Sequence, residues 1–210
     1  MILLDTYQGS EVDTHLTKFA DLAQGQTLTM NYRDVGSEQD WLTQAQSAVS
    51  QQAYDQAVIN PQIKPPRVSS IFGETEQGLY FKNSLCPLLN SDRVYTSAYT
   101  PNGFMGWHTD CDVAGWYIMF SYNEGPGSKF YWVNGDKVQV LDEPLGWTIK
   151  AGEAPNQAPY FWHAALSTTP KWTAIMFWDD QQAWSRACDV VTTKSSLDPV
   201  PGLVLYGIFE

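Results

Sequence analysis

A mainly β protein with a helical N-terminal flank is predicted by two patterns in these 210 residues. As far as the proline-rich stretch 61–66, apolar residues recur at helical spacing. From Arg67 onward, short β-branched and aromatic runs alternate with turn residues at intervals of about ten positions, which is typical of an antiparallel sandwich or barrel. We expect a single domain, with residues 1–65 as helical flank, 66–180 as β core and 181–210 as a C-terminal extension.

Two helices are expected in the flank. The first begins at Ser10, which is followed by acidic residues of the kind that favour a helix N-terminus, and it continues to about residue 23. The second is predicted from Ser37 to about Val58. Ser37 and Asp40 resemble a capping box, and Trp41 opens an apolar stripe behind them.

Nine strands are predicted after the flank. Asn134-Gly135 lies between two of them and predicts a hairpin with a type I′ turn, which requires positive φ at both central residues. The apolar run 203–209 is expected to add a strand or to wrap the outside. The predicted strands are Arg67–Phe72, Gly78–Phe81, Val94–Thr100, Trp116–Tyr122, Lys129–Val133, Lys137–Leu141, Gly146–Lys150, Tyr160–Ala164 and Trp172–Trp178.

Composition and charge exclude several classes of protein. Hydrophobic residues make up 43% of the chain and aromatic residues 14%, which is too apolar for intrinsic disorder. No apolar run approaches the roughly 18 residues of a membrane span, and three widely spaced cysteines suit a reducing compartment, so we expect a cytoplasmic protein without a membrane partner. A net charge of −11 disfavours a nucleic-acid partner, because such a surface repels phosphate backbones. The oligomeric state is left open.

Two of the three histidines stand in a pattern that suggests a metal site. Residues two apart on a strand share a face, so His108 and Asp110 can bind one ion together. His163, at the start of a later predicted strand, supplies a third ligand. Two imidazoles and one carboxylate form the facial triad of non-haem Fe(II) oxygenases. An isolated His-x-Asp triplet is common by chance, and the combination with a later histidine on a β framework is what favours the metal site.

Lys171 is the only Lys or Arg between Lys150 and Arg186, and it opens a very apolar strand. One interpretation is a lysine that extends its ammonium group to water. The other is a fixed charge for an anionic co-substrate. Fe²⁺ with one carboxylate ligand is +1 and a dicarboxylate keto acid is −2, so one lysine restores neutrality. Thr173, on the same face, can donate a hydroxyl to the same carboxylate.

These residues carry a resemblance to a known superfamily. His108-Thr109-Asp110, His163 and Lys171-Trp172-Thr173, in that order on short strands, resemble the Fe(II)- and 2-oxoglutarate-dependent oxygenases, which have a double-stranded β-helix (jelly roll) core. The resemblance covers about Val94–Asp180. It implies Fe(II), 2-oxoglutarate and O2 as cofactors, with decarboxylation of 2-oxoglutarate to succinate and hydroxylation of a C–H bond in a protein, peptide or small-molecule substrate.

The resemblance also implies roles for individual residues. His108, Asp110 and His163 would be the iron ligands, and Lys171 would bind the distal carboxylate of 2-oxoglutarate. Tyr99, at a position where the superfamily often has a tyrosine, would reach the same co-substrate. Apart from the resemblance, we expect Thr173 and Tyr122 to face that co-substrate as well. The superfamily usually has Arg-x-Ser/Thr on the last core strand, and Lys-x-Thr here implies weaker 2-oxoglutarate binding or a different keto acid.

Two subfamilies remain open. The segment Tyr99–Asp110 is similar to the prolyl 4-hydroxylase-like enzymes, whereas Arg67–Glu74 and His108–Asp112 are similar to AlkB-type nucleic-acid demethylases. We favour the hydroxylase, because no Lys or Arg occurs between Arg93 and Lys129, around the presumed mouth of the site.

Substrate contacts and rival functions complete the predictions. Trp107, Trp116 and Asp112 are the candidates for lining the substrate pocket, although packing explains most tryptophans and a solvated turn explains Asp112. A non-enzymatic β-sandwich binding module and a hydrolytic zinc enzyme with the same three ligands are the rivals. A cupin with a His-x-His motif is disfavoured, because the histidines that it needs are absent.

Overall fold

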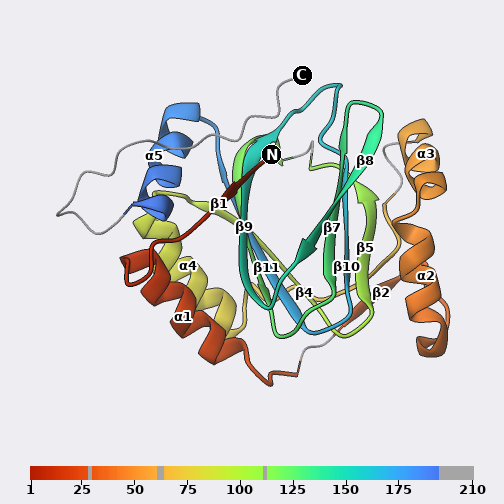
Figure 1. Cartoon of the computed structure of the whole chain (residues 1–210), viewed down its shortest axis with the longest axis horizontal. Helices are drawn as coiled ribbons and strands as arrows, with labels where there is room; N and C mark the ends of the chain where they lie inside the picture. The colour runs from red at the N-terminus through yellow and green to blue at the C-terminus, as the bar shows by residue number, and fades with distance from the viewer. Residues whose placement is uncertain (28–29, 61–63, 111–112, 194–210) are drawn as a thin grey trace.

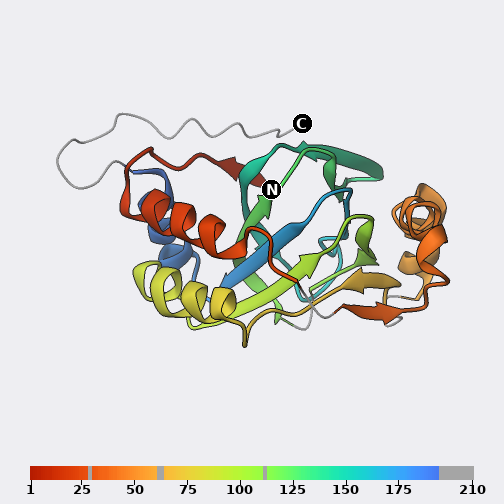
Figure 2. The same ribbon diagram turned by 90° about the horizontal axis from the view of Figure 1, so that it is seen from below.

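The computed structural model describes the chain except residues 28–29, 61–63, 111–112 and 194–210. In the described part, eleven strands form two antiparallel sheets and five α-helices cover their outer faces (Figures 1 and 2). The prediction of a mainly β protein with N-terminal helices is therefore confirmed. None of the described helices combines the length and the apolar character that a membrane span requires.

The first sheet has five strands in the order β1-β9-β6-β11-β4. Its outer face is apolar and carries α1 (Glu11–Ala23), α4 (Glu76–Leu88) and α5 (Gln181–Thr192), which Figure 1 shows on one side of the molecule. The strands are β1 (Ile2–Leu4), β4 (Arg93–Tyr99), β6 (Gly115–Asn123), β9 (Gly146–Ala154) and β11 (Lys171–Trp178).

The second sheet has six strands in the order β2-β3-β5-β10-β7-β8. Helices α2 and α3 pack on its outer face, at the opposite end of the molecule from α1 (Figure 1). The strands are β2 (Asn31–Arg33), β3 (Arg67–Ser69), β5 (Gly103–His108), β7 (Ser128–Asn134), β8 (Lys137–Glu143) and β10 (His163–Ser167).

The eight strands from β4 to β11 alternate between the two sheets, except that the hairpin β7–β8 lies within one sheet. One sheet takes β4, β6, β9 and β11, and the other takes β5, β7, β8 and β10. A third apolar cluster lies between the sheets and includes Tyr117 and Phe177 from the first sheet and Phe130 from the second. This arrangement encloses an interior that both sheets line, and the polar residues discussed below face into it.

Four of the five described α-helices begin where a capping side chain satisfies free backbone N–H groups, and α2 is the exception, because Asp40 at its start makes no such hydrogen bond. Ser10 accepts from the N–H of Asp13 at the start of α1 (Glu11–Ala23), as the acidic helix start predicts. The predicted second helix is instead two helices, α2 (Trp41–Ala48) and α3 (Gln51–Ile59). The break lies at Ser50, whose hydroxyl caps the new helix by accepting from the N–H of Ala53. The flank also contributes β1 and β2, which helical periodicity did not predict.

The predicted strand Gly78–Phe81 is wrong, because these residues belong to α4 (Glu76–Leu88). Thr75 caps that helix, and Phe81 and Leu85 lie four residues apart on its buried face. Gly78 is required there, because an added Cβ would lie 2.0 Å from the carbonyl oxygen of Phe72.

Two other local predictions need correction. The C-terminal extension begins with a helix, α5 (Gln181–Thr192), capped by Asp180, and the run 203–209 lies outside the described residues. The hairpin at Asn134-Gly135 is confirmed, but β7 and β8 pair Asn134 with Lys137, so the central residues are Gly135 and Asp136. Only Gly135 of these two has positive φ, which matches glycine at the first central position of a type II′ turn rather than a type I′ turn.

Candidate metal centre and buried charge cluster

The two predicted histidine ligands are brought together by strand pairing. His108 ends β5 and His163 begins β10, and the antiparallel register makes them direct cross-strand partners. Their ring centroids are 4.1 Å apart. Side chains that lie opposite each other on adjacent strands share a face of the sheet, so both imidazoles point into the same space.

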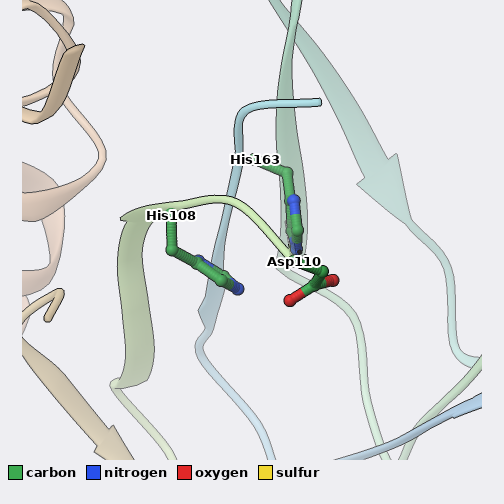
Figure 3. A group of neighbouring side chains, drawn as sticks. All are labelled: His108, Asp110 and His163. Carbon is green, nitrogen blue, oxygen red and sulfur yellow. Dashed lines mark ion pairs between the residues drawn. The ribbon is translucent and has the colours of Figure 1, made fainter. Parts of the chain in front are cut away.

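Asp110 completes the group. It follows β5 by two residues, and its Oδ2 lies 3.6 Å from Nε2 of His163. One ligand atom from each of His108, Asp110 and His163 lies within 4.8 Å of the others, and Figure 3 shows the three side chains converging. The structure thus assembles the predicted triad.

Backbone carbonyls orient both imidazoles. Nδ1 of His108 lies 2.9 Å from the carbonyl oxygen of Gly106, and Nδ1 of His163 lies 3.2 Å from that of Phe161. A carbonyl can only accept, so Nδ1 is the donor in each ring, and Nε2 is the nitrogen left to face a metal ion. Metal-binding histidines are typically held by a second hydrogen bond of this kind.

The electrostatics of His163 also suit a metal ligand. The side chain is 3% exposed and stacks against Phe130 and Phe161. Burial, followed by the neighbouring His108, lowers the pKa of His163 to about 4. The ring is therefore neutral at pH 7, which is the state that binds a metal. The donor set, the orientation of its two rings and the neutral state of His163 all fit a divalent ion.

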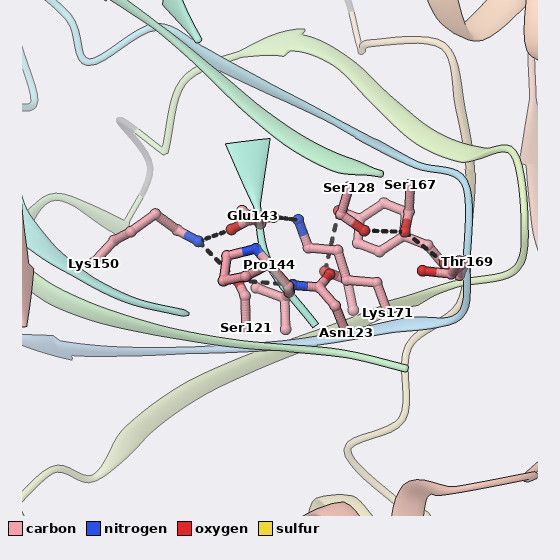
Figure 4. Close-up of polar contacts among 12 residues, drawn as sticks. Ser121, Asn123, Ser128, Glu143, Pro144, Lys150, Ser167, Thr169 and Lys171 are labelled. Atoms are coloured by element: carbon pink, nitrogen blue, oxygen red, sulfur yellow. Dashed lines mark hydrogen bonds and ion pairs between the residues drawn. The ribbon is translucent and has the colours of Figure 1, made fainter. Parts of the chain in front are cut away.

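A cluster of three buried charges lies in the same interior. The carboxylate of Glu143, at the end of β8, forms ion pairs with the ammonium groups of both Lys150 on β9 and Lys171 on β11 (Figure 4). All three side chains are at most 2% exposed. The Nζ of Lys150 also donates to the hydroxyl of Ser121, 2.9 Å away. Lys171 is thus a buried, paired lysine, and the interpretation that its ammonium group extends to water is wrong.

The cluster carries one more positive than negative charge. Burial alone would raise the pKa of Glu143, but the ammonium groups of Lys150 and Lys171 overcome it and hold that pKa well below its usual value. Burial lowers the pKa of Lys150 to about 8, against the opposing effect of Glu143. A buried site with a surplus cation is expensive unless an anion joins it.

Two more of the predicted co-substrate residues lie beside this cluster. Tyr99 is the cross-strand partner of Lys171, whose Nζ lies 5.7 Å from the Tyr99 ring centroid. Burial raises the pKa of Tyr99 to about 12, so its phenol keeps its proton. Thr173 shares the face of Lys171, and its hydroxyl oxygen lies 3.5 Å from that of Ser121. The structure therefore gathers Lys171, Tyr99 and Thr173, as the sequence predicted.

Phe130 lies between the charge cluster and the candidate metal centre. Its ring centroid is 5.6 Å from that of His163 and 4.9 Å from the Nζ of Lys150. The triad and the charge cluster are therefore neighbouring parts of one interior, separated by a single aromatic ring.

The prediction that Tyr122 faces the co-substrate is wrong. On β6 the neighbours Ser121 and Asn123 face the interior, so Tyr122 faces outward. Its ring packs 5.2 Å from that of Trp147, in the core under α1.

The two tryptophans proposed for the substrate pocket are packing residues. Trp107 lies in the core under α2 and α3, where its Nε1 donates to the carbonyl oxygen of Ser50. Trp116 packs against Trp184 of α5, with ring centroids 4.6 Å apart. Asp112 lies outside the described residues, so its predicted role stays a prediction.

A cavity of about 420 Å³ opens beside the triad. Its wall includes His108 and Asp110, and also three basic residues from the N-terminal flank and β3, which are Arg33, Lys64 and Arg67. The expectation that the mouth of the site lacks basic residues is therefore wrong. The local sequence around Asp110 contains none, and the fold brings them from far along the chain.

Sequence reasoning missed Glu143 and Lys150 as well as these three basic residues. A weak signal existed for Lys150, because a lysine inside the predicted strand Gly146–Lys150 is unusual among apolar neighbours. No local signal marked Glu143, whose neighbour Asp142 is a solvent-exposed carboxylate in the same strand.

No protein-family model and no curated protein matches the chain. Among solved structures, a prolyl-4-hydroxylase from Pseudomonas putida is 11% identical over 77% of this chain and 98% of that chain, with a TM-score of 0.33. A 2OG-Fe(II) oxygenase family oxidoreductase from Burkholderia pseudomallei is 10% identical over 84% and 95%, with a TM-score of 0.35. A prolyl hydroxylase from Trichoplax adhaerens, solved with a hypoxia inducible factor peptide, is 12% identical over 86% and 97%, with a TM-score of 0.37. These likenesses are too distant to support an activity, which must rest on the site itself.

Proposed function

We propose that the protein is an Fe(II)- and 2-oxoglutarate-dependent oxygenase that hydroxylates a C–H bond. In the overall reaction one atom of O2 enters the new C–OH group and the other enters succinate, while C1 of 2-oxoglutarate leaves as CO2. The observation that carries the proposal is the convergence of His108, Asp110 and His163, with each Nδ1 held by a backbone carbonyl and each Nε2 left to face an ion.

The strand order supports the same proposal. Strands β4 to β11 divide four and four between two sheets that enclose the site, and eight strands in two packed sheets are the architecture of a jelly roll. We infer that residues 66–180 form the double-stranded β-helix that the sequence predicts. The triad then lies where β5 ends and β10 begins, on the sheet that lacks α1, α4 and α5.

The three ligands would hold iron through His108 Nε2, His163 Nε2 and an oxygen of Asp110. Bound iron, together with 2-oxoglutarate and O2, supplies the oxidising power that removes hydrogen from an unactivated C–H bond. The protein keeps His163 unprotonated through burial and fixes both rings through the carbonyls of Gly106 and Phe161. The aromatic rings of Phe130 and Phe161 exclude water from one side of His163.

The buried charge cluster supports a dicarboxylate co-substrate. The surplus charge of Lys150 and Lys171 over Glu143 matches the single charge of a distal carboxylate, which would make the interior neutral. Lys171 and Lys150 would donate to that carboxylate, and the hydroxyls of Tyr99 and Thr173 lie on the same side. Glu143 would then balance the positive charge of the second lysine. A site with a single basic anchor does not need such a carboxylate.

The proposal is tested by succinate formation in the presence of 2-oxoglutarate and O2. We expect succinate to form only when Fe(II) is added, and to be lost in the Asp110→Ala variant. Lys171→Met should raise the KM for 2-oxoglutarate more than it lowers kcat, because it removes a group that binds the co-substrate in both ground and transition states. Activity that is supported by Zn²⁺ and independent of oxygen would contradict the proposal and favour the hydrolase. No metal binding at all would favour a binding module.

A further inference from the structure

The cavity beside the triad has the size of a small-molecule site and two chemically different walls. Its volume of about 420 Å³ lies in the range of pockets that enclose small ligands. The candidate iron ligands His108 and Asp110 form part of its wall. Three basic residues, Arg33, Lys64 and Arg67, line another part of the wall.

These basic residues lack counter-charges. Among the described residues, the ion pairs within 4.0 Å involve other cations, and none includes Arg33, Lys64 or Arg67. The chain has only 12 Lys and Arg against 23 Asp and Glu, so three unpaired cations at one cavity are not explained by an abundance of basic residues.

Two of the basic residues lie opposite each other, and the repulsion between their charges is unfavourable for the stability of the sheet. Arg33 on β2 and Arg67 on β3 are direct cross-strand partners, and like charges in this position destabilise a sheet. The Nε of Arg67 is buried and has no hydrogen-bond partner in the described part of the chain. Burial, followed by the charge of Arg33, lowers the pKa of Arg67. An unpaired buried donor beside a like charge is the environment that an incoming anion relieves.

The remaining wall defines the rest of the ligand. Met105, Ile175 and Phe177 contribute apolar surface, and Tyr95 adds an aromatic ring. Such a wall favours an apolar body, whereas a guanidinium fork favours a planar carboxylate or a phosphate. The ligand would therefore have one anionic end and an apolar portion.

We propose that the cavity binds the oxidised substrate, a small organic carboxylate or phosphate monoester, with its anionic end on Arg33 and Arg67 and its apolar portion towards the triad. Oxidation of that portion rests on the proposed function, whereas anion binding does not. Lys64 adds a third positive charge to the wall of the same cavity. A nucleic-acid polymer is disfavoured by the net charge of −11, and a short oligonucleotide is included below as an alternative ligand.

The test is calorimetric titration of the metal-free 210-residue protein with three matched probes. Phenyl phosphate and phenylacetate carry the two anionic groups, and benzyl alcohol is a neutral control of similar shape. We expect at least one anion to bind about tenfold or more tightly than benzyl alcohol, since a charged hydrogen bond contributes about that much. The preferred anion identifies the head group. Equal binding of all three probes would overturn the proposal, as would a single-stranded oligonucleotide that binds more tightly than either anion.

Variants connect the binding to the arginines. Arg67→Gln and Arg33→Gln should each weaken anion binding about tenfold, while Arg186→Gln, at an exposed position on α5, should leave it unchanged. Arg33→Gln should also raise the melting temperature, because it removes the like charge opposite Arg67. A purely structural arginine would give the opposite change in stability. Unchanged anion binding in folded Arg33→Gln and Arg67→Gln proteins would overturn the assignment.

The two proposals can fail separately. Anion binding without iron-dependent succinate formation would leave this cavity as a binding site and refute the oxygenase. Iron-dependent succinate formation without anion binding would support the oxygenase and refute the substrate class.

Discussion

Replacing Glu143 by glutamine is the perturbation that most sharply tests the buried charge cluster. Glu143→Gln keeps the shape of the side chain and removes its charge. Glu143 is the carboxylate that pairs with both Lys150 and Lys171, and all three side chains are almost fully buried. The variant therefore leaves two ammonium groups in the interior with no opposing charge from the cluster.

The expected loss of stability follows from that geometry. Removing one partner of a buried ion pair costs about 3–5 kcal/mol. The protein can limit the cost by releasing a proton from Lys150, whose pKa burial already lowers to about 8. Releasing the proton of an ordinary lysine at pH 7 costs about 5 kcal/mol, at about 1.4 kcal/mol for each unit of pKa. We therefore expect the free energy of unfolding at pH 7 to fall by about 3–5 kcal/mol.

The variant should also acquire a pH dependence of a defined sign. Losing Glu143 lowers the pKa of Lys150 further in the folded state, while the unfolded chain keeps the ordinary value. Between the two pKa values the unfolded state binds more protons, so the free energy of unfolding rises with pH. We expect a slope approaching 1.4 kcal/mol per pH unit around neutrality in the variant, and a much flatter profile in the wild type below pH 8.

Urea unfolding across pH 6–9 measures both quantities. The matched control is Asp142→Asn. It removes a carboxylate charge from the residue next to Glu143, and the Asp142 side chain forms a solvent-exposed ion pair with Lys129 instead of a buried one. In Asp142→Asn the free energy of unfolding should fall by less than about 1 kcal/mol, and its dependence on pH should match that of the wild type. A Glu143→Gln protein that is as stable as Asp142→Asn, or whose stability falls as pH rises over this range, would refute the buried cluster.

Other variants test the packing, the metal-free site and the co-substrate pocket. Gly78→Ala should lower the free energy of unfolding by about 1–3 kcal/mol in urea, because its Cβ would lie 2.0 Å from the Phe72 carbonyl oxygen; wild-type stability would contradict that close approach. The free energy of unfolding of the metal-free protein should fall by up to about 3 kcal/mol as pH falls from 6.5 to 4. Over this range His163 takes up a proton in the unfolded chain, whereas in the folded chain the pKa of His163 is about 4 and the ring stays neutral. This loss should disappear in His163→Gln, and a flat wild-type profile would contradict the buried neutral ring. Tyr99→Phe should raise the KM for 2-oxoglutarate, whereas Tyr122→Phe, on the outer face, should leave it unchanged; equal effects would contradict the assignment of the two faces.

The sequence predicted the triad because its parts follow short-range rules. His108 and Asp110 are two residues apart, which places them on one side of an extended segment whatever the fold. His163 was identified as a later histidine on the same β framework, and the pairing of β10 with β5 then places it opposite His108. Lys171 and Thr173 are also two apart on one strand, so their common face could be predicted as well.

The errors arise where both faces of an element are buried or where distant segments meet. Residues of β6 alternate between the interior and the core under α1. Large aromatic side chains are found in both environments, so the sequence does not indicate which of the two Tyr122 and Trp116 face. Gly78–Phe81 has the composition of a strand, and only the cap at Thr75 and the spacing of Phe81 to Leu85 indicate a helix. Periodicity within one segment does not carry such information.

The charge cluster and the basic cavity depend on sheet order. Glu143 meets Lys150 and Lys171 because β8 lies in one sheet and β9 and β11 lie in the other. Arg33 and Arg67 reach the cavity because β2 and β3 extend the second sheet beyond β5. A sequence without an alignment does not determine which strands pair, so these contacts became visible only in the structure.

The most direct test of the account is anaerobic titration of the metal-free protein with Fe(II), followed by calorimetry. We predict one ion bound per chain, with binding lost in His163→Ala and retained in His15→Ala, which removes the one histidine outside the triad. Adding 2-oxoglutarate should tighten the binding of iron in the wild type. Iron binding that survives in His163→Ala, or that is lost equally in both variants, would contradict the proposed metal centre.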